Sequence, residues 1–98
     1  MPTMPPTEIE AFLEAPRHAV IGTNARNGPP QLSPVWYLYA DGKFYISITT
    51  GTAKYRNLRR DPRLSLCIDG GHSDYRAVIV YGVAEVLPGD APAAEDLR

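Results

Sequence analysis

The stretch that decides the fold reads TTGTAKYRNLRRDPR and runs from Thr49 to Arg63. A β-branched run leads into it, the chain turns at Gly51, and the pattern predicts a helix from about Ala53 to Arg60. Thr52 stands where an N-cap residue is expected, and Pro62 ends the helix. A strand, a hydroxyl-rich turn and a helix start favour an anion at this point, because the N–H groups and dipole of the helix attract it.

Two side chains of this helix point to a specific ligand. Lys54 and Asn57 are three residues apart, so they lie on one helix face. Hydroxyl groups precede them at Thr49, Thr50 and Thr52. We predict that this stretch holds the phosphate of a cofactor, with Lys54 supplying a positive charge. The alternative is that Lys54 and Asn57 are solvated helix residues and that the threonines only cap the helix.

The segments around this helix read as strands joined by tight turns. Five runs predict strands, at His18–Asn24, Gln31–Ala40, Lys43–Thr49, Leu64–Asp69 and Tyr75–Leu87. The Asn-Gly pair at 27–28 and the Asp-Gly pair at 41–42 predict hairpins between neighbouring runs. Pro34 lies inside the second run, where it marks a bulge or an edge position because proline donates no ladder hydrogen bond.

The pattern of hairpins with one inserted helix predicts a mainly β fold, an antiparallel barrel or sandwich. Five strands leave a barrel incomplete, so a further segment or another chain must close its edge. A homodimer is the simplest closure. The fifth strand is apolar on both faces over much of its length, and we expect both faces to be covered.

The two ends of the chain carry weaker signals. Thr7 to Glu10 matches a capping box, which predicts a short helix with Thr7 as its N-cap and Pro16 at its end. The tail from Pro88 reads as the start of another helix, beginning at Asp90 or Ala91. With 98 residues and no internal repeat, the sequence predicts one domain over 1–98.

Composition narrows the possible functions. The net charge of −1 argues against a polyanion binder that works by bulk electrostatics. The single cysteine excludes an intramolecular disulfide and fits a reducing compartment. His18 and His72 are too few and too far apart to indicate a metal site. With no apolar run long enough for a membrane span and no signal-peptide pattern, a cytoplasmic protein without membrane contact is predicted.

Three segments resemble one known family. They are NGPPQLSPVWY (27–37), FYISITTGTAKYRNLRRDPRLSLCID (44–69) and YRAVIVYGVAEV (75–86). Together they are similar to the pyridoxamine 5′-phosphate oxidase-like flavoproteins, and most of all to the branch that uses the deazaflavin F420. The resemblance covers about 18–87, and its most specific part is the run from Lys54 to Arg63.

The resemblance implies an FMN-binding split β-barrel, with short helices, that works as a homodimer with two cofactor sites at the interface. It places the cofactor phosphate against Lys54 and Asn57 and beside the end of the preceding strand. It places the tricyclic ring beside the segment around Pro34. The implied cofactor-binding residues are Pro34, Val35, Trp36, Ser47, Thr49, Thr50, Lys54 and Asn57. FMN and F420 share this cradle, so both stay open.

Members of the family usually continue with another helix and a final strand, whereas this sequence stops at Arg98. We therefore expect a single domain that lacks that C-terminal part, either as a fragment of a longer protein or with a dimer built differently. His72 is a weaker candidate to approach a partner's cofactor, because it lies in a loop.

These observations predict an oxidoreductase that uses F420 or FMN on a small organic molecule. No catalytic side chain is assigned, because such a cofactor moves the hydride itself. One alternative is a non-catalytic carrier or sensor of the same cofactor. Another is a small nucleic-acid-binding barrel that uses the basic helix, but the acidic balance of the chain and the absence of a basic stripe on the strands argue against nucleic acid.

Overall fold

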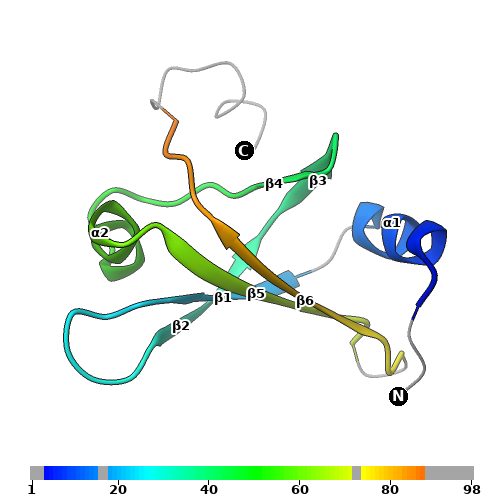
Figure 1. Cartoon of the computed structure of the whole chain (residues 1–98), viewed down its shortest axis with the longest axis horizontal. Helices are drawn as coiled ribbons and strands as arrows, with labels where there is room; N and C mark the ends of the chain where they lie inside the picture. The colour runs from blue at the N-terminus through cyan, green and yellow to red at the C-terminus, as the bar shows by residue number, and fades with distance from the viewer. Residues whose placement is uncertain (1–3, 16–17, 72–73, 88–98) are drawn as a thin grey trace.

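A computed structural model describes residues 4–15, 18–71 and 74–87 (Figure 1). Its elements are α1 (Pro6–Glu14), β1 (His18–Thr23), β2 (Gln31–Trp36), β3 (Leu38–Ala40), β4 (Lys43–Tyr45), α2 (Ala53–Arg60), β5 (Arg63–Asp69) and β6 (Ala77–Val83). All strand pairs are antiparallel. The mainly β, antiparallel class with short helices is therefore confirmed.

The strands form two sheets. The larger has the order β2-β1-β5-β6, and the smaller pairs β3 with β4. Pro34 lies on the edge strand β2 and pairs with Val20 of β1, which confirms the predicted edge position. The hairpin at 41–42 is also confirmed: Asp41 and Gly42 both have positive φ, at 54° and 72°, as a two-residue type I′ turn requires.

Three predicted strands differ from the observed ones. The predicted strand Gln31–Ala40 is divided at Tyr37, so its two parts join different sheets. The Tyr37 hydroxyl donates to the carbonyl of Leu13 at 3.1 Å, a contact with α1 that the local sequence does not reveal. The predicted strand Lys43–Thr49 ends at Tyr45, and the predicted strand Tyr75–Leu87 spans only β6.

The predictions at the chain ends have mixed outcomes. The first helix exists, but Thr7 lies inside it rather than at its N-cap. The N-cap is Pro5 and the helix begins at Pro6, because the fixed φ of proline suits the first helical position and the missing N–H costs no hydrogen bond there. The predicted stop at Pro16 and the predicted tail helix lie outside the described residues.

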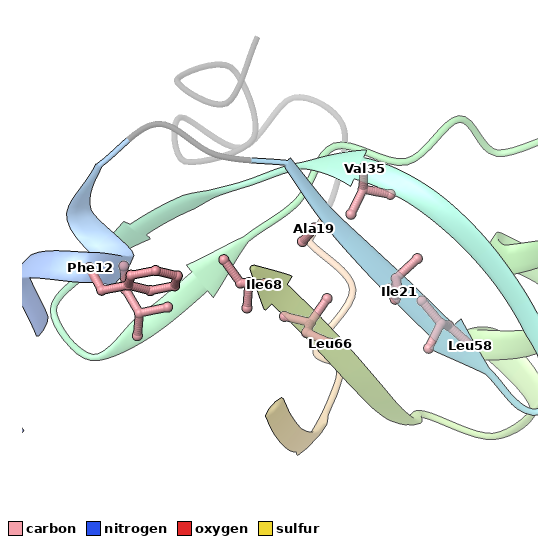
Figure 2. Close-up of a cluster of buried hydrophobic side chains, with 8 residues drawn as sticks. Phe12, Ala19, Ile21, Val35, Leu58, Leu66 and Ile68 are labelled. Atoms are coloured by element: carbon pink, nitrogen blue, oxygen red, sulfur yellow. The ribbon is translucent and has the colours of Figure 1, made fainter. Parts of the chain in front are cut away.

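The hydrophobic core lies on one face of the larger sheet, where β1 and β5 alternate buried and less buried residues (Figure 2). Helix α1 covers this face at one end of the sheet and α2 at the other (Figure 1). The buried apolar side chains are Phe12, Leu13, Ala19, Ile21, Val35, Leu58, Leu66 and Ile68. Aromatic rings of the β3–β4 segment pack against them from the side, so a 98-residue chain forms one continuous core.

Helix α1 is held by polar contacts as well as by its apolar side chains. The Arg76 guanidinium forms an ion pair with Asp74 at 2.6 Å and with Glu8 on α1 at 3.3 Å. It also lies 5.0 Å from the centre of the Phe12 ring. These contacts tie α1 to the segment before β6, two regions far apart in the sequence. Neither described helix is long and apolar enough to cross a membrane.

The opposite face of the larger sheet is uncovered within the chain. We call it the open face, and its large apolar side chains are Val20, Leu32, Trp36, Ile79, Tyr81 and Val83. Their exposed fractions lie between 41% and 81%. The expectation that both faces of the last strand are covered is therefore wrong for the isolated chain. A contiguous apolar face of this kind marks an interaction surface.

We expect Leu66→Ala to lower the free energy of unfolding by about 2–5 kcal/mol, because Leu66 is 2% exposed and its loss leaves a cavity in the core. Leu38→Ala is the matched control, since the same atoms are removed from a side chain that is 47% exposed. Urea unfolding followed by circular dichroism measures both. Equal losses in the two variants would contradict the position of the core.

Candidate functional site

The start of α2 is built as the sequence predicts. Thr52 is its N-cap: the side-chain oxygen accepts from the N–H of Tyr55 at 3.4 Å and donates to the carbonyl of Thr49 at 2.7 Å. The Arg56 guanidinium donates to the carbonyl of Gly51 at 3.1 Å. These bonds fix the turn that leads into the helix, so its first N–H groups have a defined direction.

Lys54 connects the helix start with the edge of the sheet. Its ammonium donates to the side-chain oxygen of Ser33 on β2 at 3.0 Å, and its side chain is half-buried. Ser33 immediately precedes Pro34. The structure thus brings the predicted phosphate end and the predicted ring end of the site together. An ammonium has three donors, so the bond to Ser33 leaves capacity for an anion.

Asn57 lies one turn further along α2, and its amide is engaged within the chain. Its Nδ2 donates to the Thr23 hydroxyl at 3.0 Å and to Oε1 of Gln31 at 3.3 Å. Its Oδ1 accepts from the Arg60 guanidinium at 3.3 Å. A side-chain amide has two donors, and both are in use. Asn57 therefore anchors α2 to β1 and β2, and contact with a phosphate would require one of these bonds to be released.

A second set of polar contacts holds the C-terminal end of α2. The Arg60 guanidinium donates to the carbonyl of Asn24, and the Asn24 side-chain amide donates to Asp61 at 3.1 Å. Asp61 in turn pairs with Arg63 at 2.8 Å. Hydrogen bonds from the side chain and the backbone N–H of Arg63 hold the pKa of Asp61 well below its usual range. The C-terminal end of α2 is thus tied to the segment that directly follows β1.

The remaining predicted residues fall into two groups. Pro34 is exposed and Trp36 is 66% exposed, whereas the Val35 side chain is buried in the core. The Trp36 ring lies against the His18 imidazole, with 3.8 Å between ring centroids. In the segment between β4 and α2, the exposed candidates are Ser47, Thr49 and Thr50. His72 lies outside the described residues.

Sequence reasoning missed the partners of the two helix residues. Thr23, Gln31 and Ser33 receive the hydrogen bonds of Lys54 and Asn57. One signal was present: Gln31 and Ser33 are polar and alternate with Leu32 and Pro34, so they share one strand face. Which element covers that face depends on long-range packing. No group of three His, Cys, Asp or Glu side chains suited to a metal ion occurs among the residues the structure describes.

Comparison with known proteins identifies relatives of the chain. The family model for pyridoxamine 5′-phosphate oxidase matches residues 5–98. A conserved hypothetical protein from Mycobacterium tuberculosis has a similar structure, with 32% identity and a TM-score of 0.82. The match covers 97% of this chain and 59% of that protein, so the chain spans less than two thirds of its length.

Two further similar structures are those of ligand-binding proteins. A FAD-binding protein from Mesorhizobium loti is 28% identical with a TM-score of 0.75, over 91% of this chain and 65% of that protein. A heme binding protein from Mycobacterium smegmatis is 26% identical with a TM-score of 0.71, over 91% of this chain and 40% of that protein. Two proteins of similar structure are therefore a FAD-binding protein and a heme binding protein.

The Asp61–Arg63 contact predicts a pH-dependent stability. Because Arg63 lowers the folded-state pKa of Asp61, the stabilisation is present above the ordinary aspartate pKa of about 4 and is lost as the pH falls below it. We expect Asp61→Asn to be less stable than the wild type at about pH 7, with the difference narrowing toward about pH 2.5. Urea unfolding at both pH values measures it. A difference that is independent of pH would contradict the assignment.

Proposed function

The chain belongs to the pyridoxamine 5′-phosphate oxidase family, and from this premise we propose that it binds FMN or F420 as an oxidoreductase acting on a small organic molecule. The observation that carries the proposal is the position of Lys54. Its ammonium lies at the start of α2, within hydrogen-bond distance of the residue before Pro34. Lys54 would therefore hold the phosphate at a point from which the cofactor extends along β2.

The residues present fit the phosphate end of such a cofactor. Lys54 retains donors for an anion, and the first turn of α2 adds backbone N–H groups and the positive end of the helix dipole. Asn57 keeps a different role in this proposal: its engaged amide positions α2 and hence Lys54. Thr49, Thr50 and Ser47 line the approach, since all three are exposed just before the helix.

The ring end of the proposed site lies on β2. Pro34 is exposed on the edge strand, and Trp36 stands two residues along on the same face. The backbone of 34–36 would run beside the ring. This part of the site opens onto the open face, so we include a homodimer in the proposal, with a second copy closing the site.

The reaction needs few groups from the protein. FMN or F420, when bound, supplies the hydride-transfer chemistry, and the chain binds it, orients it and shields it from water. This division of labour explains why a site with one lysine, hydroxyl groups and apolar walls is sufficient. The alternative within the same site is a carrier or sensor. It differs in one observable, since it would bind the cofactor tightly without turning over quinones, enones or tetrapyrroles.

A second candidate ligand is haem, and one feature of the structure favours it. The His18 imidazole is exposed at the end of the apolar open face, beside the Trp36 ring. Imidazole is a common ligand of haem iron, and an apolar face suits the porphyrin. The similarity to a heme binding protein supports this candidate.

We expect Lys54→Ala to weaken binding of FMN or F420 by about 1.5–3 kcal/mol, because a charge-assisted hydrogen bond to the phosphate is lost. Fluorescence titration with each cofactor measures the affinity. Ser33→Ala is the control, because it removes the tether of Lys54 but keeps the ammonium. If Lys54→Ala binds as tightly as the wild type, the phosphate assignment is wrong. If both variants lose affinity equally, the loss comes from the Lys54–Ser33 hydrogen bond that both remove, and not from a contact between the ammonium and the phosphate.

If His18 ligates haem, then His18→Ala should abolish the Soret shift that hemin shows on titration into the wild type. Cys67→Ser is the control, because Cys67 is a half-buried thiol on the same sheet face and the only cysteine in the chain. A Soret shift that survives in His18→Ala would remove this histidine as the ligand.

A further inference from the structure

Two tyrosines hold the segment that follows β2 from its inner side. β2 ends at Trp36 and the chain joins the smaller sheet at Leu38, so the ladder of the larger sheet does not extend past Trp36. Exposure alternates along this segment: Trp36 and Leu38 are exposed, whereas Tyr37 and Tyr39 are half-buried and pack against the core. The tyrosines therefore fix the inner side of a segment whose outer side carries Trp36.

The rings of both tyrosines pack on one side chain of β4. The centroid of the Phe44 ring lies 5.6 Å from that of Tyr37 and 5.0 Å from that of Tyr39, and both pairs are tilted. Tilted aromatic pairs favour defined ring directions as well as burying apolar area. With the rings held in this way, both tyrosine hydroxyls reach helix α1.

Tyr37 satisfies the C-terminal end of α1. Leu13 lies in the last turn of this helix, where backbone carbonyl groups have no partner within the helix. The Tyr37 hydroxyl donates to the Leu13 carbonyl at 3.1 Å, and the Leu13 side chain is buried. Earlier on the same helix, the Glu10 carboxylate accepts from the Tyr39 hydroxyl at 3.0 Å. The segment after Trp36 is thus joined to α1 at two points.

From these contacts we propose that Tyr37 and Tyr39 are positioning residues of the cofactor site, through which the docking of α1 sets the direction of Trp36. This inference rests on the proposed function, in which the cofactor ring lies beside 34–36. Neither hydroxyl touches the cofactor in this proposal, since both donate to α1. Linkage makes the coupling reciprocal: if docked α1 favours the bound cofactor, then the bound cofactor favours docked α1.

Trp36 reports its own position without any cofactor. It is the only tryptophan of the chain, and it is 66% exposed with its ring against the His18 imidazole. A change in the direction of the Trp36 ring changes its contact with the imidazole and with solvent, and hence its fluorescence and the quenching of that fluorescence by acrylamide. The position of Trp36 is therefore measured separately from binding.

Removal of single hydroxyl groups tests the proposal. We expect Tyr37→Phe to raise the acrylamide quenching constant of Trp36 in the cofactor-free chain and to weaken binding of FMN or F420 by about threefold to tenfold, the scale that one hydrogen bond sets. Tyr39→Phe should change both quantities in the same direction but by less, because its bond to Glu10 is exposed. Bound cofactor should slow amide hydrogen exchange in α1, and more in the wild type than in Tyr37→Phe.

Two further variants separate this coupling from a general effect of a lost hydroxyl. Tyr45→Phe is the matched control, because Tyr45 pairs with Leu38 in the same small sheet and its hydroxyl makes no hydrogen bond to α1 in the part of the chain that the structure describes. It should retain the quenching constant and the affinity of the wild type. Glu10→Ala should match Tyr39→Phe, and the double variant should be no worse than either, because all three lack the same bond.

The outcomes distinguish this inference from the proposed function. Unchanged quenching and affinity in Tyr37→Phe would overturn the positioning role alone, provided that the wild type binds FMN or F420. Equal changes in Tyr45→Phe, or additive losses in the double variant, would also overturn it. A wild type that binds neither cofactor overturns the coupling together with the proposed function.

Discussion

The hydrogen bond from the Asn57 amide to the Thr23 hydroxyl is the constraint on which the site depends. Thr23 is 1% exposed, the only buried polar residue among those described. A buried hydroxyl without a partner is costly, so this bond penalises any shift of α2 away from β1. The second Asn57 donor reaches Gln31 on β2. One amide therefore fixes the helix relative to two strands, and the position of Lys54 follows from it.

The two faces of the larger sheet have different roles. One face is closed by both helices and by the β3–β4 segment, and it contains the core that stabilises the chain. The other face is apolar and exposed. The proposed cofactor site lies where these two faces meet, along the edge strand β2. In our proposal, binding and association therefore share one strand, and a dimer would complete what a single chain leaves open.

Local signals predicted much of the fold because they act over a few residues. The Thr52 cap, the Asp-Gly turn and the edge position of Pro34 each follow from backbone geometry that neighbouring residues impose. The local signals did not predict that the strand expected over Gln31–Ala40 is divided into β2 and β3. At the point of division, the Tyr37 hydroxyl donates to the carbonyl of Leu13, 24 residues away, and no local pattern predicts such a contact.

The same distinction holds for the site. The sequence alone determined that Lys54 and Asn57 share a helix face, because helical periodicity is local. It also indicated the family, through the resemblance of residues 27–37, 44–69 and 75–86, and the family model that matches residues 5–98 confirms it. Only the tertiary structure separated the two roles: Asn57 has both donors engaged by Thr23 and Gln31, whereas Lys54 has donors to spare. The physical reason is that the number of donors left for a ligand depends on partners brought together by folding.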